Sequence, residues 1–375
     1  MSENNNFIPY AKQWLDEDDI KSVAAILRTD LITQGPAIDE FENKVAEYTG
    51  SKYAVAVSSG TAALHAAYHA IGIKQGDEVI TTPLTFAGTS NAIIYCAGIP
   101  VFADIDPNTL NISPEEIEKK ITEKTKAIAV VDFAGVPCDY DKIQEIAKKH
   151  NLIVVEDACH ALGAEYNGRK IGGISDVTAL SFHPVKHITT GEGGLVLTNN
   201  KEWADKIRSF RHHGTVKYPE KGGWYYDIAE PGYNYRITSF QCALGLSQFK
   251  KLDRFVKRRR EIAEVYDKSF SDTEEIITPK ETNEVKSSWH IYPIQFKTKN
   301  RREMFDAFRE NNIGVQVHYT PVHLLSFYKN KFDYKKGDFP NTEKYSERAV
   351  TLPLFPKMTD EEVQRVIQVT KQIIE

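Results

Sequence analysis

A lysine stands where an apolar run gives way to a glycine-rich turn. Lys186 ends residues 181–186 (Ser-Phe-His-Pro-Val-Lys), and the turn at residues 191–194 contains three glycines. The apolar neighbours Phe182 and Val185 would lower the pKa of the amine by shielding it from water, which makes it a nucleophile toward an aldehyde. The simpler interpretation is a solvated surface lysine, since the chain has 47 Lys and Arg residues.

A second ionisable group stands at the end of another apolar run. Asp157 closely follows residues 152–155, which are all aliphatic (Leu-Ile-Val-Val). Packing alone does not explain an aspartate there. A carboxylate paired with a pyridine nitrogen keeps that nitrogen protonated, so that the ring acts as an electron sink. An aspartate and a lysine at two strand ends together predict a site for pyridoxal phosphate.

A Ser/Gly/Thr-rich segment offers a place for the cofactor's phosphate. Residues 58–64, which include Gly60, join a predicted strand to a helix whose first amides have no partner within the helix. Those amides, together with the hydroxyls, make an anion site. Any strand-to-helix turn also favours Ser, Gly and Thr for capping. The motif therefore indicates a phosphate site only in combination with the Lys186 and Asp157 motifs. Ser181, at the end of another strand, would add a hydroxyl to the same phosphate.

Two further side chains are candidates for contact with the cofactor ring. Phe86 follows a predicted strand and would stack on a flat heteroaromatic ring, although a core phenylalanine is the alternative in a chain with 18 Phe. His160 would hydrogen-bond the phenolic oxygen of the cofactor. The alternative for His160 is a structural histidine whose hydrogen bonds are satisfied within the protein.

The composition is ordinary for a globular protein that processes small molecules. Hydrophobic residues make up 41% of the 375 residues and charged residues 26%, and the net charge of −5 gives no reason to expect nucleic-acid binding. No apolar run approaches the length of a membrane span, and no basic segment leads into an apolar stretch at the start. We therefore expect a cytoplasmic protein without a nucleic-acid or membrane partner. The four cysteines show neither disulfide nor zinc spacing, so we expect reduced thiols and no metal.

Short β-rich runs alternate with helical stretches over residues 53–199, which predicts an α/β fold. Several runs are apolar throughout, as expected for strands that helices cover on both faces of a mostly parallel sheet. Ligands of such sheets bind at the carboxyl ends of the strands, where Asp157 and Lys186 fall. The predicted strands are residues 53–57, 78–81, 100–103, 127–131, 153–156, 178–182 and 195–198. The predicted helices include residues 62–70, 140–149 and 113–121, with Ser113 as N-cap and Pro114 at the first helical position.

The pattern changes beyond Thr238. It predicts one long helix through residue 266, then strands around residues 289–296 and 314–318, and a final helix from Glu361. These elements indicate a second, smaller domain. We expect a large domain with an N-terminal arm over residues 1–248 and a small C-terminal α/β domain over residues 249–375.

Two segments carry no predicted function. Residues 257–260 (Lys-Arg-Arg-Arg) are all basic, but Glu261 and Glu264 lie on the same predicted helix. This mixture of charges predicts a solvated helix face rather than a phosphate or nucleic-acid site. The first six residues are expected to be disordered.

These motifs together resemble the DegT/DnrJ/EryC1/StrS family of sugar aminotransferases, which have the type I fold of aspartate aminotransferase. The resemblance covers nearly the whole chain. It implies a type I PLP-dependent α/β fold, with a large domain built on a seven-stranded, mostly parallel sheet and a smaller C-terminal domain. Four motifs appear in the family's order and approximate spacing: residues 59–64, 156–160, 181–186 and 232–237.

The resemblance also implies roles for single residues. Lys186 would carry the cofactor and Asp157 would pair with its ring nitrogen. The phosphate would be held by Thr61, Ala62 and Ser181, and by Asn234 from the other chain of a homodimer with shared active sites. Without the resemblance, Asn234 is interpreted as a turn residue.

Within the family, residues 32–35, 181–194 and 316–319 most resemble the 4-aminotransferases of the pseudaminic acid route. Those enzymes act on UDP-2-acetamido-2,6-dideoxy-β-L-arabino-hex-4-ulose. Without this resemblance, Tyr10 is interpreted as a packed N-terminal anchor, and His318 and Tyr319 as the end of a strand. The resemblance implies that the sugar-nucleotide side of the pocket is lined by Tyr10, Ile32, Thr33, Gln34, Gly35, Gln316, His318 and Tyr319.

The sequence therefore predicts a PLP-dependent transfer of an amino group from glutamate to C4 of a nucleotide-linked 4-keto-6-deoxy sugar. Some relatives have histidine where Lys186 stands and act as dehydratases, so the lysine implies amino transfer. Three alternatives stay open: a UDP-, GDP- or TDP-linked ketosugar other than the one above, a PLP-dependent sugar dehydratase, and a PLP-binding regulator without turnover. A regulator usually carries a nucleic-acid-binding module, and the sequence shows no spare basic domain.

Overall fold

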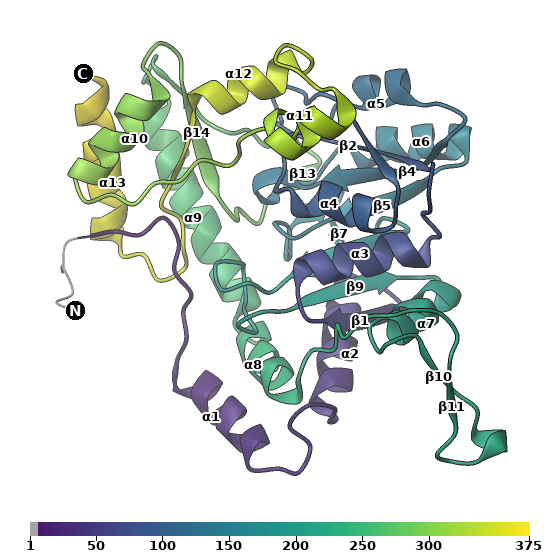
Figure 1. The fold of residues 1–375 in the computed structure, drawn as a ribbon. Helices are drawn as coiled ribbons and strands as arrows, with labels where there is room; N and C mark the ends of the chain where they lie inside the picture. Colours follow the sequence, from purple (N-terminus) through teal and green to yellow (C-terminus); the bar gives the residue numbers. More distant parts are fainter. Residues whose placement is uncertain (1–6) are drawn as a thin grey trace.

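A seven-stranded sheet forms the centre of the larger part of the molecule (Figure 1). The computed structural model describes residues 7–375, so the first six residues and the disorder expected of them lie outside the described residues. The strand order is β1-β9-β8-β5-β4-β2-β3, and only β9 runs antiparallel to its neighbours. The strands are β1 (Tyr53–Val57), β2 (Glu78–Thr81), β3 (Ile99–Phe102), β4 (Thr125–Val131), β5 (Ile153–Asp157), β8 (Val177–Ser181) and β9 (Gly194–Thr198). The structure confirms all seven predicted strands, because no predicted end differs by more than two residues.

Helices cover both faces of this sheet. Successive strand residues point to opposite faces, so Val55 packs in the core on one side while Ala54 and Ala56 pack in the core on the other. This two-sided burial explains why the strands are apolar throughout. One face is covered by α3 (Gly60–Ala70), α4 (Gly88–Tyr95) and α7 (Lys201–Phe210), and the other by α2 (Ala37–Thr49), α5 (Pro114–Lys120) and α6 (Tyr140–His150). Ser113 caps α5 by accepting from the Glu116 amide, as predicted.

A smaller antiparallel sheet lies at the other end of the molecule. It has the order β12-β14-β15, with β12 (Ile276–Ile277), β14 (Tyr292–Phe296) and β15 (Ala349–Leu352). The α-helices beyond residue 300 are α10 (Arg301–Glu310), α11 (Ser326–Phe332), α12 (Pro340–Arg348) and α13 (Asp360–Ile374), of which α11 packs on Phe102 of the large sheet. The long helix α9 (Leu252–Phe270) joins the two parts, since Phe255 packs in the core of the large sheet and Tyr266 in the C-terminal core. The division of the chain at residue 249 stays a prediction.

Short elements complete the fold. The helix α1 (Glu17–Leu27) packs on α8 (Ser239–Phe249), and β10 (Thr215–Lys217) pairs with β11 (Tyr226–Ile228) in a hairpin that extends away from the body (Figure 1). A third small sheet has the order β13-β6-β7. The remaining bounds are β6 (Glu165–Tyr166), β7 (Arg169–Lys170), β13 (Val285–Lys286) and the 3-10 turns Phe133–Gly135, Pro219–Lys221 and Val322–Leu324. Across residues 7–375, no helix combines the length and the apolar character needed to cross a membrane.

Two predictions for the C-terminal part are wrong. The predicted long helix from Thr238 is two helices, α8 and α9, separated at residues 250–251. Residues 314–318 do not form a strand, because Gln316 makes only an isolated bridge to Thr351. The third strand of the small sheet is β15, which was not predicted. The final helix begins at Asp360, one residue before the predicted start.

The prediction of a solvated face for residues 257–260 is wrong at Arg259. This side chain is only 1% exposed, and its guanidinium donates to the carbonyls of Trp289, His290 and Leu354 at 3.3, 3.0 and 2.9 Å. Burial lowers the pKa of Arg259 to about 9. The buried guanidinium therefore ties α9 to two loops of the C-terminal part, which the alternation of charges in the sequence does not reveal.

We expect Arg259→Leu to lower the free energy of unfolding by about 3 kcal/mol, because three buried carbonyls lose their donor. The matched control is Lys257→Leu on the same helix, whose side chain is 79% exposed. That change should cost less than about 0.5 kcal/mol. Urea unfolding of both variants measures the difference, and equal losses would contradict a structural role for Arg259.

Candidate active site

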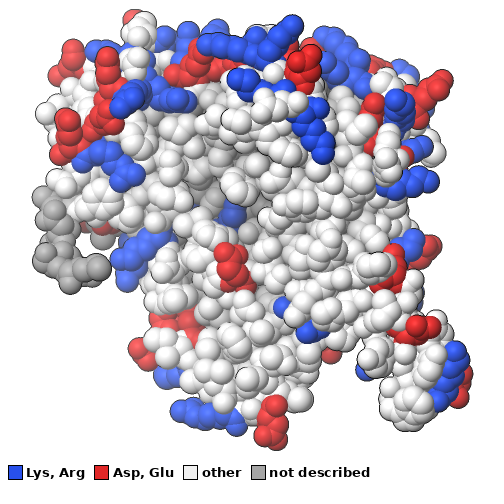
Figure 2. Space-filling model, in the orientation of Figure 1, with Lys and Arg blue, Asp and Glu red and all other residues white. Residues whose placement is uncertain are grey.

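A cavity of about 560 Å³ lies at the carboxyl edge of the large sheet. The residues that follow β1, β2, β4, β5 and β8 all reach this edge, because these strands are parallel to one another. The face drawn in Figure 2 is hollowed near its centre, with blue Lys or Arg atoms at the bottom of the hollow, and most of the other Lys and Arg side chains on this face gather along the upper edge. Ten of the predicted site residues line the cavity: Tyr10, Gly60, Thr61, Phe86, Asp157, His160, Ser181, Lys186, His318 and Tyr319.

Asp157 is held in place by two hydrogen bonds from the protein. It is the last residue of β5 and is 6% exposed. Its Oδ2 accepts from the Thr89 hydroxyl at 2.6 Å, and its Oδ1 accepts from the Cys159 amide at 3.2 Å. Thr85 in turn lies 2.9 Å from Thr89, hydroxyl to hydroxyl. The carboxylate is therefore oriented within the cavity without a cationic partner among these contacts.

Lys186 lies five residues beyond the end of β8, on the turn that leads to β9. Its amide donates to the His183 carbonyl at 2.9 Å, which closes the turn. Burial lowers the pKa of the Lys186 amine, while Cys159 and Asp157 act in the opposite direction. A larger fraction of this amine is therefore neutral near pH 7 than of an exposed lysine, as a nucleophile requires.

The turn before α3 forms a cradle beside Lys186. Ser59 caps the helix, because its Oγ accepts from the Ala62 amide at 3.1 Å. A Cβ atom at Gly60 would lie 2.9 Å from the Cβ of Ser181, so only glycine lets the ends of β1 and β8 approach this closely. A Cβ at Gly194 would lie 2.2 Å from the Ser59 carbonyl oxygen. The glycines therefore bring the helix N-terminus and the Ser181 hydroxyl to one place, as a phosphate needs.

Aromatic side chains form the opposite wall. Phe86 is 63% exposed, so the alternative of a core phenylalanine is wrong, and its ring centroid lies 6.2 Å from that of Tyr319. The Tyr319 hydroxyl lies 3.2 Å from Nε2 of His160. The other nitrogen, Nδ1, is buried and has no hydrogen-bond partner among the described residues. Burial, with a contribution from Lys186, lowers the pKa of His160 well below its usual value.

The N-terminal arm and the C-terminal part close the cavity. Tyr10 and His318 are neighbours, with ring centroids 5.8 Å apart, and the Leu354 amide bonds to the Tyr10 carbonyl at 3.0 Å. His318 is buried, and burial lowers its pKa to about 3. His318 Nδ1 lies 2.8 Å from the Thr351 hydroxyl. Both side chains therefore face the site from outside the large sheet.

The remaining predicted residues do not line the cavity of the single chain. Residues 32–35 lie between α1 and α2, where the Gly35 amide bonds to Ser239 Oγ at 2.6 Å. Asn234 is exposed and follows the hairpin of β10 and β11, and Gln316 is exposed beside Thr351. Ala62 follows the lining residue Thr61 in the chain but does not line the cavity itself, and its amide donates to Ser59 Oγ. The residues outside the lining are Ile32, Thr33, Gln34, Gly35, Ala62, Asn234 and Gln316.

Several lining residues were not predicted from the sequence. Thr89 has the clearest function in the geometry, because it orients Asp157. The sequence carries no periodic signal for it, because Thr85, whose hydroxyl contacts that of Thr89, lies before the start of α4 (Gly88–Tyr95). Glu192 and His290 gave no signal, since a glycine-rich turn and a loop carry no periodicity. The missed residues include Thr85, Thr89, His183, Glu192 and His290.

A family model described as the DegT/DnrJ/EryC1/StrS aminotransferase family matches residues 13–371. The chain belongs to this family. It is a sugar aminotransferase, and enzymes of the family depend on pyridoxal phosphate. Similar solved structures include a PLP form and a PMP form.

The chain is similar over nearly its whole length to three proteins of known name. The spore coat polysaccharide biosynthesis protein SpsC of Bacillus subtilis is 44% identical and covers 100% of this chain and 99% of its own. The UDP-4-amino-4,6-dideoxy-N-acetyl-beta-L-altrosamine transaminase of Campylobacter jejuni is 40% identical over 98% of both chains. The solved structure of Helicobacter pylori PseC, described as an aminotransferase in the biosynthesis of pseudoaminic acid, superposes with a TM-score of 0.94. It is 33% identical and covers 98% of this chain and 99% of that one.

The cavity suits the cofactor of the family on its own chemistry. It offers an amine, a buried carboxylate, a helix N-terminus with adjacent hydroxyls and an exposed aromatic ring. The unpartnered Nδ1 of His160 is a buried polar atom that a bound group would satisfy. This interpretation opposes the alternative of a structural histidine for His160, whose bonds would already be complete.

We expect Thr89→Val to lower kcat about tenfold, because a charged acceptor loses a hydrogen bond worth about 1.5 kcal/mol. Thr81→Val is the matched control: the Thr81 hydroxyl is also buried at this sheet edge but has no partner within residues 7–375. It should leave kcat within about twofold of the native value. Steady-state kinetics of the cofactor-loaded enzymes makes the comparison, and similar losses in both variants would contradict a special role for Thr89.

Proposed function

We propose that this enzyme transfers the amino group of glutamate to C4 of a UDP-linked 2-acetamido-4-keto-2,6-dideoxy sugar, as in the route to pseudaminic acid. The observation that carries the reaction class is the pair formed by Lys186 and Asp157 at the carboxyl edge of one sheet. The substrate class is supported by the 40% identity to the Campylobacter transaminase and by the similarity to PseC.

Pyridoxal phosphate, when bound, takes up an amino group at its aldehyde carbon and gives it to a ketone. In this proposal Lys186 Nζ holds the cofactor between turnovers. Once released, the same nitrogen carries a proton to and from the carbon atom that bears the amino group. The lowered pKa of Lys186 suits this exchange, because the amine must both accept and release a proton near neutral pH.

Asp157 and the aromatic wall would orient the ring. The carboxylate keeps a free lone pair on each oxygen after accepting from Thr89 and Cys159, so that it can hold the ring nitrogen protonated. Phe86 would lie against the ring. His160 would form a hydrogen bond to the phenolic oxygen of the cofactor through its Nδ1, which has no partner within residues 7–375. Thr61, Ala62 and Ser181 would hold the phosphate at the N-terminus of α3.

A second copy of the chain would complete the site. Large apolar side chains are exposed on α1 and on the hairpin, among them Ile20, Leu27 and Trp224, which is 80% exposed. Exposed apolar side chains that lie together on one surface mark interaction surfaces, as Ile20 and Leu27 do on α1. Asn234, Thr33 and Gln34 lie on or next to these surfaces rather than in the cavity of their own chain. In the proposed homodimer Asn234 would reach the phosphate in the partner's cavity.

The substrate is tested with a panel of UDP-, GDP- and TDP-linked 4-keto-6-deoxy sugars at equal concentration. We expect the UDP-linked N-acetylated ketosugar to have the highest kcat/KM, and the label of amino-¹⁵N glutamate to appear at C4. Faster amination of a TDP- or GDP-linked sugar would overturn the substrate class and leave the reaction class intact. Loss of water from the sugar without transfer of the label would instead indicate a dehydratase.

The shared site is tested by mixing two inactive chains. Lys186→Ala removes the amine, and Asn234→Asp places a negative charge against the phosphate, so that each homodimer should keep less than about 1% of the activity. A heterodimer of the two should regain about half of the native activity per dimer, because one of its two sites then combines native Lys186 with native Asn234 from the partner.

The control is a mixture of the Lys186→Ala chain with itself under the same exchange conditions, which should gain nothing. Native mass spectrometry establishes that heterodimers form. If they form and activity stays at the level of the parents, Asn234 does not act in the partner's site.

A further inference from the structure

We propose that Asp104 is a positioning residue, which sets the place of the His318–Tyr319 wall relative to the large sheet. This proposal rests on the proposed function in one respect, namely that His318 and Tyr319 face the sugar nucleotide. Asp104 lies two residues beyond β3 and does not line the cavity. Hydrogen bonds through α12 lead from its carboxylate to the cavity wall.

The helix α12 has no cap of its own. Its N-cap residue is Phe339, whose side chain has no acceptor, and Pro340 follows at the first helical position. The early amides of a helix need acceptors from outside the helix, and the residue at the N-cap normally supplies them. The local sequence therefore leaves the start of α12 dependent on another part of the chain.

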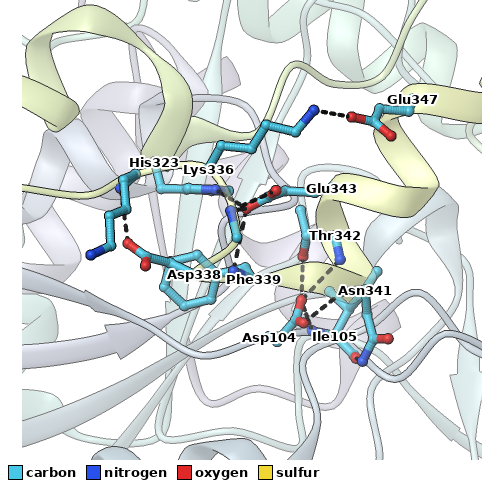
Figure 3. A network of polar contacts seen from close by, with 12 residues as sticks. Asp104, Ile105, His323, Lys336, Asp338, Phe339, Asn341, Thr342, Glu343 and Glu347 are labelled. Atoms are coloured by element: carbon cyan, nitrogen blue, oxygen red, sulfur yellow. Dashed lines mark hydrogen bonds and ion pairs between the residues drawn. The ribbon is translucent and has the colours of Figure 1, made fainter.

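Asp104 provides the missing acceptors from the large sheet (Figure 3). Its Oδ2 accepts from the Asn341 amide at 2.8 Å, and its Oδ1 accepts from the Thr342 amide at 3.0 Å and the Thr342 hydroxyl at 2.7 Å. Asn341 also donates its side-chain amide to the Ile105 carbonyl at 3.1 Å. Asp104 is 4% exposed, so water does not readily replace these contacts.

The segment before α12 is fixed by a second carboxylate. Glu343 accepts from the Gly337 amide at 2.8 and 2.9 Å, and its Oε1 lies 3.0 Å from Nε2 of the buried His323 (Figure 3). These contacts lie within the C-terminal part and do not reach the large sheet. Asp104 therefore provides most of the hydrogen bonds that join the start of α12 to the sheet that carries Lys186 and Asp157. Beside them lie the Asn341–Ile105 bond and the packing of Phe339 on Phe102.

One helical turn further on, α12 holds the cavity wall. The Tyr345 hydroxyl donates to the His318 carbonyl at 2.9 Å, and Ser346 Oγ donates to the Tyr319 carbonyl at 3.0 Å. Tyr345 is three residues from Thr342, a rise of only about 5 Å along the helix axis. A shift of α12 at its first turn is therefore transmitted directly to the two backbone carbonyls of the wall.

The test uses Asp104→Asn, which keeps the shape but presents an amide N–H group where two acceptors are needed. We expect KM for the UDP-linked N-acetylated ketosugar to rise about tenfold. The kcat and the rate of the half-reaction with glutamate should stay within about twofold, because Lys186, Asp157 and the α3 N-terminus are all held by the large sheet. The matched control is Thr359→Ala, which removes the cap of α13 away from the cavity. It should lower Tm to a similar extent without changing either kinetic parameter by more than twofold.

Tyr345→Phe tests the second link, since it removes the hydrogen bond to His318 but not the cap. It should raise the same KM, and the double variant with Asp104→Asn should fall well short of the product of the two single effects. Two outcomes would show that Asp104 is not a positioning residue. In the first, Asp104→Asn changes KM no more than Thr359→Ala does. In the second, Asp104→Asn slows both half-reactions equally. If the native enzyme turns over another ketosugar instead, the proposed substrate fails and the same comparison is made with that sugar.

Discussion

The site depends on keeping a half-buried amine and a buried carboxylate in one cavity without letting them neutralise each other. Lys186 and Asp157 both line the cavity, yet no ion pair joins them among the described residues. A direct pair would occupy both groups, and burying either one without compensation is costly. The chain meets this constraint by satisfying Asp157 locally, with Thr89 and Cys159, and by placing Lys186 on a turn beyond the neighbouring strand. The hydrogen-bonded register of β5 and β8 sets the separation.

The face of the sheet behind the cavity is held by a second set of carboxyls. Glu156 precedes Asp157 on β5 and points to the opposite face, where it accepts from the Tyr140 hydroxyl at 2.7 Å and from Thr178 at 2.6 Å. Asp132 lies 2.9 Å from the same Tyr140 hydroxyl. Burial raises the pKa of both Asp132 and Glu156, which agrees with a protonated Asp132 that donates to Tyr140 while Tyr140 donates to Glu156. The ends of β4 and β5 are therefore joined to each other and to the first residues of β8 just behind the reacting groups.

The parts of the structure that the sequence predicts are those with local signals. The seven strands of the large sheet are apolar runs of fixed length, and Ser113 and Pro114 mark a helix start, so both were predictable. Lys186 and Asp157 were found because charged residues at the ends of such runs are unusual. The burial of Arg259 was not predictable, since it depends on carbonyls 30 to 95 residues away in the chain. The strand β15 was missed for a related reason: only four residues long, it gains its place by pairing with β14.

The residues proposed for the chemistry and those proposed for substrate binding are also held in place by different kinds of contact. The groups proposed for the chemistry stand on one sheet, whose strands fix their positions through backbone hydrogen bonds. The groups proposed for the sugar nucleotide, Tyr10, His318 and Tyr319, come from an arm and a loop that pack against α12 and β15. Loops can change without disturbing the sheet, so one reaction can be combined with different sugars. The relatives agree with this view, because SpsC and the Campylobacter transaminase match nearly the whole chain while their names point to different products. If Tyr10, His318 and Tyr319 face the sugar nucleotide as proposed, substrate choice in this enzyme is governed by the contacts that place this wall over the sheet, rather than by the sheet itself.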